Sequence, residues 1–247
     1  MPPRRPRVAL VIPTLNEEAA IGGVIAAVPR DMVDDIIIAD SGSTDRTAER
    51  ACAGGARVVN EPRLGYGRAC LAGVMAAQDC DIIVFIDGDG SDCPEAIPEL
   101  VELIIAGGAD FVIGSRTRGV REPGSMSWHQ VFAGRAIGLL LRIIYGVRYT
   151  DMGPLRAIRR DALLALGMRE TTYGWNLEMQ MRAARAGLRI LEIPVPHRRR
   201  AGGVSKVSGS VRGTLKASAR IALTAARIAL EPRQRLPSPA SAEEIAR

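Results

Sequence analysis

The chain is poor in the residues on which several classes of protein depend. It has two histidines and four cysteines in 247 residues, with no Cys-x-x-Cys pair, so we expect reduced thiols and no structural zinc site. Aromatic residues make up 4%, and no helix-turn-helix, finger or base-stacking motif accompanies the positive charge, which argues against nucleic-acid binding. No signal-type segment and no run of about 18 uncharged apolar residues is present. We therefore expect a cytoplasmic protein that does not span a membrane.

The overall composition favours a single globular domain with an anionic partner. A hydrophobic content of 47% in 247 residues suffices for one large α/β domain. The net charge of +6 favours phosphorylated small molecules or anionic lipid as partners.

The most informative stretch is an apolar run, residues 82–86, that ends at Asp87 and Asp89. Such a run indicates a buried parallel strand, and open α/β sheets bind ligands beyond the carboxyl ends of their strands. Two carboxylates two positions apart are hard oxygen donors that suit a divalent cation carrying substrate phosphates. The first interpretation is a metal–diphosphate site.

Three other interpretations compete for this stretch. An EF-hand fails, because the positions that need Gly and Glu hold Asp92 and Pro98. In an aspartyl-phosphate phosphatase, Asp87 would be the nucleophile and Asp89 an acid. A solvated turn that only ends the strand also fits the local residues.

Strands and helices alternate along the chain, which predicts a doubly wound, mainly parallel sheet with flanking helices. The expected strands are 8–12, 35–40, 57–60, 81–87, 110–114 and 188–194. The expected helices are 17–28, 65–77, 97–105, 131–145, 160–166 and 176–186 and one after residue 44. Residues 119–127 are expected to form a flap over the site, and residues 151–156 a loop.

A basic amphipathic helix is expected after the catalytic domain. We divide the chain into a domain at 1–203, a helix at 204–230 and a loose tail at 231–247. The cations of this helix would either reach lipid phosphates or face water while the apolar stripe packs on the domain or a second subunit. They are Arg212, Lys216, Arg220 and Arg227.

Several motifs, in order and spacing, resemble those of family 2 glycosyltransferases with the GT-A fold. They are Val11–Glu18 (VIPTLNEE), Asp40–Thr47 (DSGSTDRT), Gly65–Ala69 (GYGRA), Asp87–Gly90 (DGDG) and Gly114–Arg116 (GSR). Two later strings, Asp151–Arg156 and Arg200–Lys206, resemble motifs of the dolichyl- or polyprenyl-phosphate sugar synthases. The resemblance covers residues 7–206.

The resemblance implies a role for each matching residue. The donor nucleotide would be held by Pro13, Thr14, Asn16, Glu17, Asp40, Gly65, Gly67, Arg68, Asp87 and Gly88. Asp87 and Asp89 would hold Mg²⁺ or Mn²⁺ against the diphosphate. Cations would be supplied by Arg116, Arg156, Arg200 and Lys206. A general base, if the acceptor needs one, would be Asp151 or Glu178.

The implied activity is inverting transfer from a UDP- or GDP-linked sugar to a polyprenyl phosphate, with peripheral contact at the inner membrane face. The alternatives are a hydroxyl acceptor with the same donor chemistry, a non-catalytic nucleotide-sugar binder and, more distantly, the phosphatase. Two departures affect this expectation: Ser91 stands where relatives often have Gln, which leaves the third metal ligand open, and the Asp151–Arg156 motif is one residue shorter. A homo-oligomer is compatible with the sequence.

Overall fold

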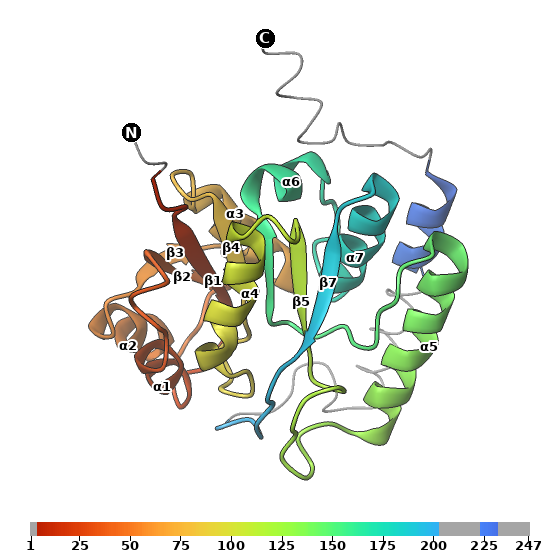
Figure 1. Ribbon diagram of the computed structural model, residues 1–247. Coiled ribbons are helices and arrows are strands. Elements are labelled where there is room, and N and C mark those ends of the chain that lie inside the picture. The colour runs from red at the N-terminus through yellow and green to blue at the C-terminus, as the bar shows by residue number, and fades with distance from the viewer. Residues whose placement is uncertain (1–3, 203–222, 232–247) are drawn as a thin grey trace.

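The computed structural model describes residues 4–202 and 223–231. Its centre is a seven-stranded sheet with the order β3-β2-β1-β4-β6-β5-β7 and helices on both faces (Figure 1). The strands are β1 (Val8–Thr14), β2 (Asp35–Asp40), β3 (Arg57–Asn60), β4 (Ile82–Phe85), β5 (Phe111–Ser115), β6 (Arg156–Arg159) and β7 (Ile190–Pro194). The helices are α1 (Ile21–Ala26), α2 (Thr47–Ala53), α3 (Tyr66–Ala76), α4 (Ile97–Ile105), α5 (Trp128–Tyr145), α6 (Arg160–Ala165) and α7 (Trp175–Ala186), with a 3₁₀ turn, η1 (Pro94–Ala96), before α4.

The sheet separates two layers of apolar side chains. Along β1, Val8, Leu10 and Ile12 face the layer that contains α1 and α4. Ala9 and Val11 face the opposite layer, which contains side chains from α3 and α7. This alternation follows from the two-residue period of a strand, and it explains why β1 is apolar throughout.

The predicted α/β fold with a mainly parallel sheet is confirmed, and one strand is an exception. β6 lies antiparallel between β4 and β5, with Arg156 opposite both Phe85 and Ile113. The sequence predicted a loop up to Arg156, because a four-residue strand with arginine at each end lacks the usual apolar alternation. β6 is held by its two neighbours rather than by its own β propensity.

Residues 223–230 are helical and pack against the catalytic domain. Ile228 is fully buried in the apolar layer that contains α7, and the Arg227 guanidinium donates to Glu178 Oε1 at 3.0 Å. The expectation that Arg227 reaches lipid phosphates is therefore wrong. The remainder of the predicted helix, residues 204–222, lies outside the described residues. Within 4–202 and 223–231, no helix is long and apolar enough to cross a bilayer.

Candidate active site

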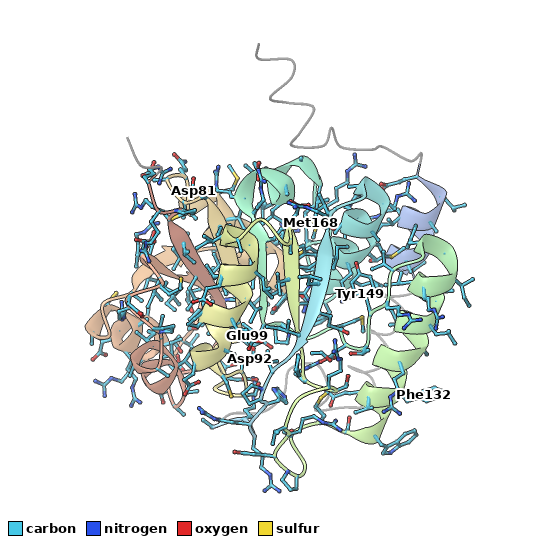
Figure 2. The ribbon with its side chains drawn as sticks, in the orientation of Figure 1. Asp81, Asp92, Glu99, Phe132, Tyr149 and Met168 are labelled. Atoms are coloured by element: carbon cyan, nitrogen blue, oxygen red, sulfur yellow. The ribbon has the colours of Figure 1, made fainter. Side chains whose placement is uncertain are left out.

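The sequence motifs meet at the carboxyl edge of the sheet, where β1 lies between β2 and β4. The chain runs from β1 to β2 and β3 on one side, and then crosses back to β4 on the other, so the strand order reverses at this point. A crevice at such a reversal is the usual ligand site of an open α/β sheet. Thr14 and Asp40 end β1 and β2, and the Asp87–Asp89 turn follows β4. In Figure 2, Asp92 of this turn lies at the opposite end of the sheet from Asp81.

Asp87 sits in an environment that disfavours its negative charge. Desolvation and the adjacent charge of Asp89 raise the pKa of Asp87 to about 6, although the Tyr66 hydroxyl donates to its Oδ1 at 3.0 Å. The Asp87 backbone N–H donates to Oδ2 of buried Asp92 at 2.9 Å. A cation placed between the carboxylates of Asp87 and Asp89 would relieve their repulsion.

Arg200 supplies a positive charge to Asp89. Its guanidinium lies 3.1 Å from Asp89 Oδ2 and 3.1 Å from Glu17 Oε1. Ser91 donates to the other oxygen, Asp89 Oδ1, at 2.6 Å. The cation role predicted for Arg200 is thus compatible with the structure, in which Arg200 contacts Asp89, one of the two predicted metal ligands.

The donor set fits Mg²⁺ or Mn²⁺ carrying a diphosphate. Asp87 and Asp89 offer hard carboxylate oxygens, and within the described residues no group of three or more His, Cys, Asp or Glu side chains is arranged to hold a metal ion. Divalent ions of this kind are often held by one or two carboxylates, with phosphate and water completing the shell. Asp87 and Asp89 therefore remain the predicted protein ligands of such an ion.

The predicted nucleoside residues form a connected turn. Asp40 is 6% exposed and accepts from the Thr14 hydroxyl at 3.1 Å and from the Ser43 N–H at 2.9 Å. Asn16 has a left-handed backbone, with φ of 53°, and its side-chain oxygen accepts the Thr44 N–H at 2.8 Å. These bonds join the ends of β1 and β2 and hold Asp40 in place. A role in binding the base or ribose remains a prediction.

The structure gives a reason for glycine at positions 65 and 67 that differs from the predicted one. The expectation was that they let the backbone approach the nucleotide base. In the structure a Cβ at Gly65 would lie 2.3 Å from the Thr171 carbonyl oxygen, and one at Gly67 would lie 2.2 Å from that of Glu170. The Arg68 N–H donates to the same Thr171 oxygen at 3.2 Å. These glycines admit a neighbouring protein loop, and the loop fixes the start of α3.

Gly67→Ala should destabilise the protein by about 3 kcal/mol, because overpacking against a backbone carbonyl cannot be relieved by rotating a side chain. Chemical denaturation measures this loss. Gly22→Ala in α1 is the control, since a Cβ there meets nothing within 4 Å, and it should be neutral or gain up to about 1 kcal/mol. A Gly67→Ala protein of native stability that binds nucleotide poorly would restore the original interpretation.

Arg116 and Asp151 form a buried ion pair beside the carboxylate pair. Arg116 Nε and Nη2 lie 2.7 and 2.8 Å from the two Asp151 oxygens, and the Arg116 backbone N–H donates to Oδ2 at 2.9 Å. Burial alone would raise the pKa of Asp151, but the bonds from Arg116 outweigh it and the pKa of this carboxyl is lowered. Asp151 therefore holds Arg116 in position, and a carboxylate engaged in this way is a poor proton acceptor.

Arg156 does not lie where the sequence placed it. It was predicted to supply charge to the diphosphate, yet it is fully buried at the start of β6. Its guanidinium donates to the carbonyls of Gly153 and Asn176 and lies over the Phe111 ring at 5.9 Å. Burial lowers its pKa. With both terminal nitrogens donating to backbone carbonyls, Arg156 supports the loop before β6 rather than a ligand.

Glu178 is also engaged by protein groups rather than available to a substrate. This alternative base is fully buried on α7, where Oε2 accepts the backbone N–H groups of Arg169 and Glu170 and Oε1 accepts from Arg182 and Arg227. Four donors occupy a carboxylate that has about four lone-pair sites. Glu178 therefore joins α7 to the preceding loop and to residues 223–230, and the prediction that it is a base is wrong.

Some site residues were not assigned from the sequence, and one assigned residue cannot be placed. Tyr66 and Asp92 contact Asp87, and His197 is buried with Nδ1 3.9 Å from Asp92 Oδ1. Burial and nearby arginines lower the pKa of His197 to about 4, so this imidazole is neutral at pH 7. Tyr66 lies inside the GYGRA motif, and that position was its only sequence signal. Lys206 lies outside the described residues.

The order of the seven strands and the position of the carboxylate turn after β4 define a GT-A type fold. The model of glycosyl transferase family 2 matches residues 9–167, and the chain belongs to that family of enzymes. An uncharacterized glycosyltransferase of Mycobacterium tuberculosis is 41% identical over 214 residues, which are 84% of this chain and 93% of that protein.

Two further relatives are similar to this chain. Undecaprenyl-phosphate mannosyltransferase of Micrococcus luteus is 34% identical over 230 residues, with coverage of 84% of this chain and 90% of that protein. Among solved structures, glucosyl-3-phosphoglycerate synthase of M. tuberculosis, in complex with Mn²⁺, UDP-glucose and glycerol 3-phosphate, has a TM-score of 0.73 and 27% identity. The structural match covers 92% of this chain and 81% of the synthase chain.

Proposed function

We propose that this glycosyltransferase moves a sugar, with inversion, from a nucleoside-diphosphate sugar to a polyprenyl phosphate. The observation that carries the proposal is the engagement of Asp151 by Arg116. A hydroxyl acceptor needs a base to take its proton, and both predicted bases, Asp151 and Glu178, are buried carboxylates engaged by arginine donors. A phosphate monoester has a second pKa of about 6 and arrives already ionised near pH 7.

The chemistry that follows is a direct displacement. An acceptor phosphate oxygen forms a bond to the anomeric carbon while the bond from that carbon to the donor diphosphate breaks. The electron pair leaves with the nucleoside diphosphate, so negative charge grows on the leaving oxygen. A divalent ion held by Asp87 and Asp89 would stabilise that charge when bound.

The residues of this chain then divide the remaining work. Arg200, which contacts Asp89 and Glu17, is placed to neutralise diphosphate oxygens beside the carboxylate pair. Arg116 remains fixed by Asp151 and offers a second, preorganised cation. Asp40 and Asn16 are suited to the nucleoside end, because a carboxylate would repel the diphosphate.

The test is an assay for released nucleoside diphosphate with three additions: a polyprenyl phosphate, the matching polyprenol, or no acceptor. Release should require the phosphate, and its rate should rise as pH passes about 6 and remain level above about 7, where the acceptor is ionised. Release with the polyprenol alone would refute the phosphate acceptor. A screen of UDP- and GDP-linked sugars by thermal shift identifies the donor.

A second candidate keeps the donor chemistry and uses a small acceptor. The structural likeness to glucosyl-3-phosphoglycerate synthase, whose solved complexes include phosphoglyceric acid, favours it. Adding phosphoglyceric acid to the same assay separates the two candidates, because each predicts release with one acceptor only.

A further inference from the structure

The outer side of α5 is unusually apolar for a surface helix. Four of its large apolar side chains face outward, with exposed fractions of 79% at Trp128, 68% at Phe132, 58% at Leu139 and 74% at Ile143. They recur at intervals of four, seven and four residues and therefore lie along one stripe of the helix. Leu140 and Ile144 extend the same surface at 46% and 37%. We call these six side chains the α5 stripe.

The side of α5 that meets the domain has glycine at its closest contacts. Gly134 and Gly138 are buried, and a Cβ at Gly138 would lie 2.0 Å from the Tyr149 carbonyl oxygen. Leu141 fills the next turn on this side. The helix is thus seated closely on residues 149–151, with Ile137 and Tyr145 also packed against the domain and the α5 stripe left exposed. A stripe of this kind on a folded protein marks an interaction surface.

The charges around the stripe indicate the partner. α5 contains Arg135 and Arg142, which are both exposed, and no Asp or Glu in its 18 residues. An apolar face bordered by arginine, with tryptophan at one end, is the composition of a helix that lies in the interface of an anionic bilayer. A twofold contact between two copies would instead bring the arginines of one α5 near those of the other.

We propose that the α5 stripe docks this enzyme on an anionic lipid surface, with α5 lying in the plane of the interface. This inference goes beyond the proposed acceptor, because it concerns the surface and not the transferred sugar. The seat of α5 on residues 149–151 joins the stripe to Asp151 and hence to Arg116. In Figure 2, Phe132 projects outward at the lower end of α5, and Asp92 also lies in the lower half of the view.

The experiment combines vesicle flotation with quenching of tryptophan fluorescence by brominated lipid. Vesicles of phosphatidylglycerol and dibrominated phosphatidylcholine should bind the full chain and quench Trp128, whereas Trp175, which is 1% exposed in the core, should not be quenched. Trp128→Phe should still float but lose the quenching. Salt or pure phosphatidylcholine should weaken binding, as should the pair Arg135→Gln and Arg142→Gln.

The decisive variant replaces Phe132 and Ile143 with serine and should weaken partitioning roughly 100-fold. The matched control replaces Met75 and Leu164, which are 52% and 42% exposed on α3 and α6, and should bind as the native chain does. Equal loss in the control, no flotation on anionic vesicles, or a dimer in vesicle-free solution that the Phe132 and Ile143 replacements dissociate would overturn the proposal.

The activity assay distinguishes this inference from the proposed function. With a short, water-soluble polyprenyl phosphate and no vesicles, the Phe132 and Ile143 variant should turn over normally. With the long-chain acceptor in vesicles it should lose activity in proportion to binding. Failure of both native reactions would refute the acceptor, whereas normal vesicle activity in the unbound variant would refute only the role of the stripe.

Discussion

Asp89→Asn should lower turnover by about 1,000-fold, because the interaction it removes is strongest in the transition state, when charge builds on the leaving diphosphate. The substitution keeps the shape of the side chain and removes the charge that Arg200 and a divalent ion would share. Steady-state kinetics across a range of Mn²⁺ concentrations measures the effect, and calorimetry of Mn²⁺ with nucleoside diphosphate gives a readout that is independent of turnover.

Asp79→Asn is the matched control for Asp89, since Asp79 is exposed and lies away from the site turn, next to the start of β4. It should leave both kinetics and Mn²⁺ binding unchanged. Native turnover by Asp89→Asn in the presence of a chelator would remove the metal–diphosphate assignment.

Glu178→Gln should cost about 3 kcal/mol of folding stability while leaving turnover per folded molecule within about threefold of native. The neutral amide cannot accept from four donors, and it removes the charge that pairs with Arg182 on α7, leaving Arg182 with Glu231 alone among the described residues. Urea denaturation reports the stability, and active-site titration with labelled nucleotide gives the concentration of folded enzyme.

Glu102→Gln on the exposed side of α4 is the control for this variant and should change neither quantity. A Glu178→Gln protein that is as stable as the native chain yet nearly inactive would return Glu178 to the role of base. A loss of stability with normal turnover per folded molecule would instead mean that Glu178 does not act as a base, as expected for a phosphate acceptor.

The parts of the fold that were predictable have strong local signals. The bounds of β2 and β3 agree with the prediction, because each is an apolar or β-branched run between turn residues. β6 was missed because Arg156 and Arg159 acquire their places only when β4 and β5 lie on either side. Pairing between strands that are distant in the sequence cannot be predicted from the residues of either strand alone.

Some residues of the candidate site could likewise be predicted from the sequence, and others could not. The Asp87–Asp89 turn could be predicted because a strand end fixes its position and its carboxylates have few other uses. The roles of Arg156 and Glu178 could not be predicted correctly. The sequence does not show whether a charged residue in a motif contacts a ligand or a partner inside the protein. Only burial distinguishes them, and both are 0% exposed.

The reversed direction of β6 has a consequence for how this enzyme can diverge. Because β6 runs against its neighbours, the residues that precede it arrive at the edge where the parallel strands finish. The segment 149–155, with Asp151 and the seat of α5, therefore reaches this edge through β6 and not through β1, β2 or β4, whose ends carry residues predicted to hold the donor. Exchanging this segment between relatives should transfer the choice of acceptor while the recognition of the donor is inherited unchanged.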